Sequence, residues 1–331
     1  MFEVVLLSSV KVIVVIMAVL TGCAYATYLE RKVVAYMQHR IGPSYAGPYG
    51  LLQPIADAIK MAFKEDIVPD RVERVTYALA PIIAFVPAML SFAVVPFSAD
   101  LSVAGHNLTG VISDLNIGIL FIFAITSLGV YGIILAGWSS GSKYSLMGGI
   151  RSSAQMISYE ISYGLSIIGV ILIANTLSMR ELVAQQATIA DWFIWKQPLG
   201  FLLYLTCAIA ETNRAPFDLP EAESELVAGY HTEYSSFRFG MFFVGEYGNM
   251  LAVSSVATTL FLGGWQGPFL PPALSIVWFV VKVFLFMFFY IWLRATLPRF
   301  RYDQLMNFGW KVLFPLALLN IIITGFVVLW K

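Results

Sequence analysis

Eight stretches of roughly 20 predominantly apolar residues recur along this chain of 331 residues, and they constrain its fold more than any other feature. An α-helix needs about 20 apolar residues to cross a hydrocarbon core about 30 Å thick. The fifth stretch is the weakest, because Lys196, Gln197 and Pro198 interrupt it. We therefore expect an all-α integral membrane protein, a single polytopic domain over residues 1–331 with eight transmembrane helices. The stretches cover residues 4–29, 77–97, 116–138, 152–174, 192–210, 239–262, 273–297 and 308–330.

The composition excludes a water-soluble protein of this length. Charged residues make up 12% of the chain, about half of the ~25% found in soluble domains. The 20 basic and 20 acidic residues cancel, so no net field indicates nucleic acid as a partner. Cys23 and Cys207 form no cluster, and the three histidines lack metal-ligand spacing, so we expect no iron–sulfur or metal centre. No P-loop or GxGxxG motif occurs, which argues against a conventional nucleotide site.

Positive charge predicts the orientation of the chain in the membrane. Fifteen of the 20 basic residues lie in or beside the first, third, fifth and seventh connecting loops. Loops rich in lysine and arginine stay on the cytoplasmic side of a membrane. With an even number of spans, both termini are then expected on the outer side. Arg299 and Arg301, just after the seventh span, are interpreted mainly as topological anchors, and Arg294 lies at the same boundary.

The first inner loop, residues 30–76, is too long for a simple connection and contains a predicted amphipathic helix over Leu51–Phe63. At 100° per residue, Leu51, Ile55, Ile59 and Phe63 fall on one side and the polar residues on the other. A helix of about 14 residues is too short to span a membrane and suits its interface. Two interpretations stay open: a surface helix that anchors the loop, or the frame of a doorway for a lipid-soluble ligand.

Two acidic residues inside predicted spans are the most informative residues of the chain. Glu160 is the ninth residue of the fourth span, about 12 Å along the helix, and Glu246 lies about two turns into the sixth. An unpaired ionised carboxylate is costly at that depth, so such a group is poised to exchange protons. The alternative is that each acid pairs with a basic side chain, such as Lys282 or a loop arginine. Two such acids in one chain favour proton handling over structural pairing.

The fifth loop is unusually acidic for its side of the membrane. A solvated run of charge is the plainer interpretation. However, apolar residues such as Phe217 and Tyr230 alternate with the acids, so the segment could fold against another element, and crowded acids must protonate or find partners. The second interpretation is therefore a coupling element that gains or loses protons when charge changes nearby. Residues 211–234 contain one arginine, Arg214, and the acids Glu211, Asp218, Glu221, Glu223, Glu225 and Glu233.

Four segments resemble a known family. They read ERKVVAYMQHRIGPSYAGPYGLLQPIADAIKMAFKED, GWSSGSKYSLMGGIRSSAQMISYEIS, AETNRAPFDLPEAESELVAGYHTEY and RATLPRFRYDQLMNFGWK. Together they resemble the H subunit (subunit 1) of respiratory complex I, and the likeness runs through nearly the whole chain. GGWQGPFLPP and FVGEYGNM look most like the bacterial-type NADH:quinone oxidoreductase.

The resemblance implies a membrane subunit of a proton-pumping NADH:quinone oxidoreductase, an enzyme whose redox centres lie in other chains. We expect quinone as substrate, and no iron–sulfur cluster, flavin or metal in this chain. The expected partners are the other membrane and peripheral subunits and the lipid bilayer, in a bacterial plasma membrane rather than a mitochondrial inner membrane. Whether the carrier is ubiquinone or menaquinone stays open. The family's quinone chamber would map onto Glu30, Arg31, Arg40, Gln53, Asp57, Lys60, Arg214, Phe217, Asp218 and Arg294, and its proton relay onto Glu160, Glu211, Glu221, Glu223, Glu225, Glu233 and Glu246.

Three other functions stay open at this point. A proton-coupled secondary transporter would also use acids near the middle of the membrane, but the two halves of the chain show no matching interrupted helices. The membrane anchor of an energy-converting hydrogenase, a relative that handles no quinone, is the second. The third is a structural platform on which peripheral subunits dock.

Overall fold

The computed structural model of the chain describes residues 2–103, 106–218, 227–269 and 271–330, and these are mostly helical. Seven long helices form the body of the molecule: α1 (Phe2–Met37), α3 (Arg74–Leu90), α4 (Gly118–Ser139), α5 (Lys143–Ala174), α10 (Ser236–Phe261), α11 (Ser275–Thr296) and α13 (Phe314–Leu329). The shorter helices are α2 (Gln53–Phe63), α6 (Met179–Ala184), α7 (Phe193–Lys196), α8 (Pro198–Glu211) and α12 (Tyr302–Phe308). A π-helical segment, Gly309–Leu313, joins α12 to α13.

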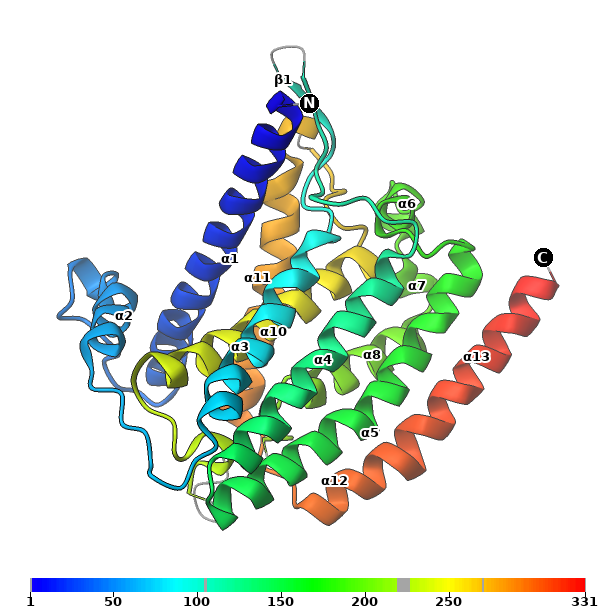
Figure 1. Cartoon of the computed structure of the whole chain (residues 1–331). Helices are drawn as coiled ribbons and strands as arrows, with labels where there is room; N and C mark the ends of the chain where they lie inside the picture. The colour runs from blue at the N-terminus through cyan, green and yellow to red at the C-terminus, as the bar shows by residue number, and fades with distance from the viewer. Residues whose placement is uncertain (1, 104–105, 219–226, 270, 331) are drawn as a thin grey trace.

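One small exception to the predicted all-α fold lies between α3 and α4. The strands β1 (Leu101–Val103) and β2 (His106–Leu108) pair antiparallel, with Leu101 opposite Leu108. This hairpin stands beside the N-terminal end of α1 (Figure 1). The hydrophobic windows did not reveal it, because three-residue strands leave no periodic signal.

By length and composition, six helices of the described residues could cross a membrane. They overlap six of the eight predicted stretches, namely the first four and the last two. A seventh candidate is a bent pair, Ile189–Lys196 and Pro198–Glu211, whose two parts meet at 71°. The remaining predicted stretch forms α10, a continuous helix of 26 residues that does not pass the same test. A polytopic membrane protein is thus supported, whereas the number eight is not confirmed.

The bend in the fifth stretch occurs where its sequence is weakest. Gln197 takes the non-helical angles φ −135° and ψ 56°, and Pro198 begins α8 at its first position. Proline disfavours the helical conformation of the residue before it and lacks a backbone N–H, so it starts a helix more easily than it continues one. The interruption that weakened the prediction is therefore a real break between α7 and α8.

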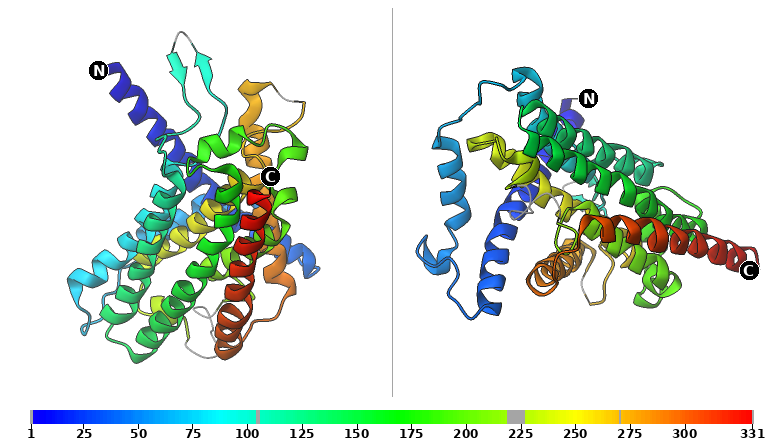
Figure 2. Two further views of the ribbon diagram at one scale, coloured as in Figure 1. Left: turned by 90° about the vertical axis from the view of Figure 1, so that its right-hand side faces the viewer. Right: turned by 90° about the horizontal axis from the view of Figure 1, so that it is seen from below.

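The helices run side by side as a bundle, with α2 standing off to one side (Figure 1) and α13 lying alongside α5 at its flank (Figure 2). Helices α3 and α4 approach closely at Gly132, where a Cβ atom would lie only 2.6 Å from the backbone nitrogen of Ala84. Small residues allow such close contact between membrane helices. At the centre of the bundle, the Tyr163 hydroxyl donates to that of Tyr204 at 2.9 Å, so that α5 and α8 are joined within the apolar core.

Lys282, in the middle of α11, does not pair with either intramembrane acid. Its ammonium group donates to the carbonyl oxygens of Leu262 at 2.6 Å, Gly264 at 2.9 Å and Gln266 at 2.6 Å. It also lies 4.5 Å from the centre of the Trp192 ring. A lysine ammonium has three donors, so all are used to hold the turn that follows α10. The sequence interpretation that named Lys282 as a partner of Glu160 or Glu246 is therefore wrong.

Substituting Lys282 tests this structural role. Lys282→Met would leave three buried carbonyl groups without their shared donor, at a cost of about 1–3 kcal/mol for an orphaned polar group. We expect the assembled protein to keep its function but to lose several degrees in its midpoint of thermal unfolding, measured on purified material. Lys196→Met serves as control, because that lysine is bound by weaker contacts, a half-exposed ion pair with Asp191 and a position 5.5 Å from the centre of the Phe193 ring. Equal midpoints for both variants would contradict the role assigned to Lys282.

Candidate functional site

Three helices and one turn bring charged side chains together at one end of the bundle. Glu30 comes from α1, Arg214 from the turn after α8, Glu246 and Tyr247 from α10, and Arg294 from the last turn of α11. We call these five residues the carboxylate–arginine cluster. Arg214 Nε lies 2.9 Å from Glu246 Oε1, and its NH1 nitrogen lies 3.5 Å from Glu30 Oε2. Arg294 pairs with the other oxygen of Glu30, and the Tyr247 hydroxyl donates to Glu30 at 2.6 Å.

Arg214 occupies the centre of this cluster and is almost completely buried, with 3% of its surface exposed. Its guanidinium lies over the Tyr247 ring, 4.4 Å from the ring centre, which adds a cation–π contact. The turn that carries it is held in place by Gln155 of α5, whose amide nitrogen donates to the carbonyls of Ala210 and Phe217 at 2.8 and 2.7 Å. Two carboxylates therefore face two guanidinium groups, as buried charges require.

The sequence left open that each intramembrane acid pairs with a basic side chain. Glu246 does so, because it pairs with Arg214 of the fifth loop. Glu160 differs. It lies half-buried on α5 between the exposed side chains of Ile157 and Ile161, and within the described part of the chain it forms no ion pair. Gly164, one turn further, has nothing within 4 Å of where a Cβ atom would stand. The carboxylate of Glu160 therefore lies on an open face of the helix.

Glu211, the last residue of α8, lies between these two acids. It is 8% exposed, and its Oε2 atom has no hydrogen-bond partner among the described residues. Its charge interacts with that of Glu160. A cavity of about 30 Å³ is lined by Glu211, Asn213, Glu246 and Asn249, among others. This space is large enough for a water molecule, which needs about 10–15 Å³ and two to four polar partners. Glu211 thus shares a cavity with Glu246 and an electrostatic interaction with Glu160, and we call these three acids the row of acids.

The predicted quinone residues of the first loop form a second, more open group next to the cluster. Arg31, which follows Glu30 in α1, binds Asp57 of α2 at 2.7 Å, and Gln53 donates to the same carboxylate at 2.8 Å. Arg31 and Arg40 line a pocket of about 550 Å³ with residues 41–45. Lys60 is exposed on α2. The apolar residues of α2 are exposed as well, Ile55 and Ile59 by about half and Phe63 by 87%.

The fifth loop packs against the bundle at the residues that the structure describes. Tyr234 stacks on Tyr77 with ring centres 4.1 Å apart, and the Tyr77 hydroxyl donates to the backbone carbonyl of Glu233 at 2.7 Å. Burial raises the pKa of Tyr234 to about 12, so this phenol stays neutral. Asp218 is buried and paired with Arg299 at 2.9 Å, so Arg299 is more than a topological anchor. Glu221, Glu223 and Glu225 lie outside the described residues.

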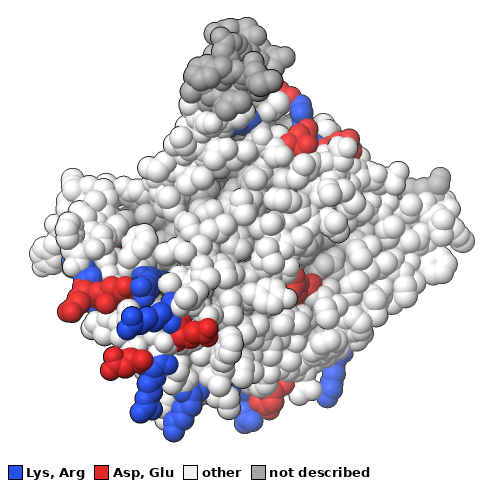
Figure 3. Space-filling view, in the orientation of Figure 1, with Lys and Arg blue, Asp and Glu red and all other residues white. Residues whose placement is uncertain are grey.

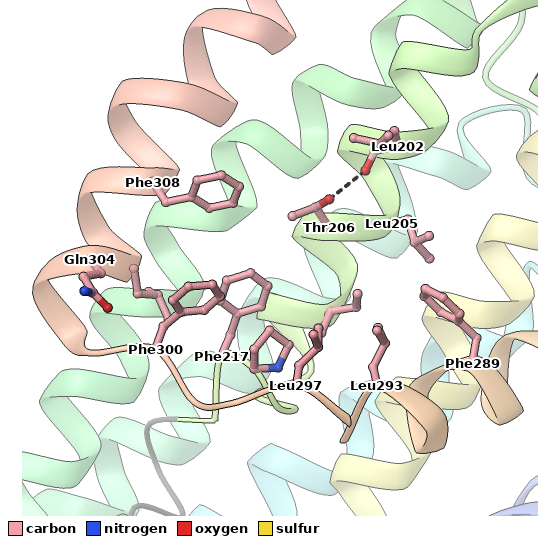
Figure 4. Close-up of a pocket in the computed structure, with 13 residues that line it drawn as sticks. Leu202, Leu205, Thr206, Phe217, Phe289, Leu293, Leu297, Phe300, Gln304 and Phe308 are labelled. Carbon is pink, nitrogen blue, oxygen red and sulfur yellow. Dashed lines mark hydrogen bonds between the residues drawn. The ribbon is translucent and has the colours of Figure 1, made fainter. Parts of the chain in front are cut away.

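The backbone N–H of Phe217 donates to the carbonyl of Arg214 at 2.8 Å, but its ring packs against apolar residues. Its ring is 5.6 Å from that of Phe300 and 6.3 Å from that of Phe308, and it helps to line an apolar pocket between α8, α11 and α12 (Figure 4). Sequence reasoning missed Gln155 and Asn249. Each is an amide in a largely apolar stretch, close in the sequence to Glu160 or Glu246. This closeness to an intramembrane acid could have identified both as candidate site residues.

These features define a class of molecule: a polytopic helical protein with a buried carboxylate–arginine cluster at one end. The family model for NADH dehydrogenase matches residues 10–325. Among curated relatives, an H subunit of the NADH-quinone oxidoreductase of Geobacter sulfurreducens is 54% identical over 329 residues, covering 96% of this chain and 94% of the relative. The H subunit from Thermomicrobium roseum is 54% identical with the same coverage, and one from Koribacter versatilis is 53% identical over 98% of both chains.

The chain therefore belongs to the family of NADH-quinone oxidoreductase H subunits. The family predicted from the four sequence segments is confirmed, and with it an oxidoreductase as the class of activity.

Proposed function

We propose that this chain is the membrane subunit of a proton-pumping NADH:quinone oxidoreductase that holds the quinone and couples its reduction to proton movement. The observation that carries the proposal is the carboxylate–arginine cluster. It lies between the open residues of the first loop and the row of acids. The names of its relatives favour quinone as substrate over the hydrogenase anchor and the transporter. The docking of other membrane and peripheral subunits is compatible with this role.

The proposed topology has eight spans in one polytopic domain, with the bent pair α7–α8 as the fifth and α10 as the sixth. Most charged side chains in view gather toward the end of the molecule away from the hairpin, a smaller group lies at the opposite end, and the surface between them is nearly uncharged (Figure 3). Both termini would then lie on the outer side of a bacterial plasma membrane. We place α2 in the membrane interface, because its exposed residues Ile55, Ile59 and Phe63 form one apolar face.

In this proposal the quinone arrives past α2 and its head group binds near the first-loop residues. Arg31, Arg40 and Lys60 supply positive charge, Gln53 and Asp57 supply hydrogen bonds, and Glu30, Arg214, Asp218 and Arg294 close the inner end. Two electrons from a partner subunit and two protons convert the quinone to the quinol. For Phe217, whose ring turns to the apolar pocket, contact with quinone stays a prediction.

The cluster explains how reduction could be linked to distant acids. Arg214 is shared between Glu30 and Glu246, so a change of charge near Glu30 alters how strongly Arg214 holds Glu246. Glu246 lines the same small cavity as Glu211, and Glu211 interacts with Glu160. A proton released at one end of this row therefore changes the proton affinity at the other. Glu221, Glu223, Glu225 and Glu233 belong to the same proposal as proton-exchanging residues of the fifth loop.

Replacing Asp57 tests the quinone site. Asp57→Asn removes the charge that binds Arg31, and charged hydrogen bonds contribute about 1.5–3 kcal/mol each. We expect the KM for a short-chain quinone to rise by about tenfold, measured with the intact complex in membranes. Asp66→Asn is the matched control in the same loop, since Asp66 makes only an exposed ion pair with Arg238. An unchanged KM in the Asp57 variant would remove the first loop from the quinone site.

A further inference from the structure

The apolar pocket beside Phe217 has no part in the proposed function. It measures about 490 Å³ and is formed by one face each of α8, α11 and α12. Leu202 and Thr206 of α8 face Phe289 and Leu297 across it, and Phe217 and Phe308 close one side (Figure 4). We call this space the α8–α11 groove. Thr206, one of its few polar residues, already donates to the carbonyl of Leu202 at 2.9 Å. The interior therefore favours a hydrocarbon chain.

Basic residues lie close in the sequence to residues that line the groove. Phe300, which lines it, stands between Arg299 and Arg301 in the sequence, and Lys311 follows Phe308 by one turn. The segment from Arg294 to Lys311 contains four basic residues and a single acid, Asp303. Its charge is therefore complementary to an anionic group at the membrane surface.

Two of these cations are available to a ligand. Lys311 is exposed, and within the described chain it forms no ion pair. Arg301 pairs with Asp303 at 3.0 Å, but their side chains are 76% and 59% exposed. Such surface pairs contribute little, so a phosphate can compete for Arg301. Arg299, by contrast, is held by the buried Asp218.

We propose that the α8–α11 groove binds one acyl chain of an anionic phospholipid, whose phosphate is held by Arg301 and Lys311. Basic pockets between helices at the cytoplasmic membrane surface bind acidic lipid head groups. The volume of the groove lies within the 300–1,000 Å³ of small-molecule sites. A transmembrane helix, 10–12 Å across with its side chains, would cover the opening rather than fill it. The proposal depends on the basic end of the bundle lying at a membrane surface and not on quinone binding.

Photoreactive lipids test the proposal on the intact complex reconstituted in vesicles. Phosphatidylglycerol and phosphatidylcholine, each with a diazirine in one acyl chain, would be compared by mapping the labelled peptides by mass spectrometry. We expect phosphatidylglycerol to label the α8 and α11 peptides severalfold more than phosphatidylcholine. Because each cation near the membrane surface contributes roughly fivefold, the double variant Arg301→Gln/Lys311→Gln should abolish that excess. Thr206→Trp should fill the groove and abolish labelling by both lipids.

A control double variant shows whether the labelling depends on these particular cations. Lys64→Gln/Lys143→Gln removes two exposed basic residues from the same end of the bundle and should leave the labelling unchanged. Should Thr206→Trp fail to assemble, the surface double variant still decides the question. Equal labelling by the two lipids, or an excess that survives the double variant, would overturn the proposal. So would protection of these peptides by a quinone with a long isoprenoid tail, or by a partner subunit that becomes labelled instead.

Discussion

Replacing Arg214 with methionine is expected to prevent stable assembly of the subunit, or to abolish quinone reduction in whatever complex still forms. The guanidinium is 3% exposed and lies between Glu30 and Glu246. Without it, Glu246 loses its cation in a poorly hydrated interior, and Glu30 keeps only Arg294 and Tyr247. Removing one partner of a buried ion pair costs about 3–5 kcal/mol. The amount of assembled complex and its quinone reductase activity in membranes are the measurements.

A double variant shows whether Arg214→Met acts by leaving Glu246 unpaired or by removing a positive charge. Arg214→Met/Glu246→Gln removes the orphaned carboxylate, so it should recover assembly that the single variant loses. Arg238→Met is the control, because Arg238 forms a partly exposed pair with Asp66 and a cation–π contact with Tyr77, whose loss should cost about 1–2 kcal/mol. If the double variant assembled no better than Arg214→Met, Glu246 would not be the residue that depends on Arg214.

The fold could be predicted from the sequence wherever the length of an apolar segment determines it. Runs of about 20 apolar residues locate six membrane-length helices, because the bilayer imposes that length. Helix ends were less predictable. Helix α5 begins at Lys143, nine residues before the predicted Ser152, since a helix continues into the polar interface where hydropathy no longer reports it. Pro198 did signal the break between α7 and α8, because its effect on the preceding residue is local.

The sequence allowed us to predict which residues belong to the candidate site, but not which of them form ion pairs with one another. Glu160 and Glu246 both lie in helices as expected, but their depth differs from the count, because α5 begins at Lys143 and α10 at Ser236, before the predicted spans. Which of them meets a cation depends on contacts across the whole chain. Glu30 and Arg294, for example, are 264 residues apart and meet only in the folded bundle. Lys282 shows the same limit, because its partners are backbone carbonyls, which side-chain composition cannot reveal.

Glu160 and Glu246 differ in whether a cation pairs with the carboxylate, and this difference leads to the second prediction, a large effect of substituting Glu160. Glu246 is neutralised by Arg214, whereas Glu160 stands on an open face of α5 and forms no ion pair with any residue the structure describes. A carboxyl group without a fixed cation in a membrane interior can change its proton occupancy at low cost, which a permanently paired one cannot. Glu160 is therefore the acid whose proton should matter most.

Glu160→Gln should preserve assembly and at least severalfold reduce the number of protons moved per electron. Glutamine has nearly the same shape and breaks no ion pair here, so the packing of α5 is retained, but it cannot take up or release a proton. Proton transport and quinone reduction would be measured together on the purified complex in sealed vesicles. Glu65→Gln, an exposed acid of the first loop, is the matched control and should behave like the unmodified protein. Undiminished transport per electron in the Glu160 variant would exclude Glu160 from the proton route and leave the row of acids ending at Glu211.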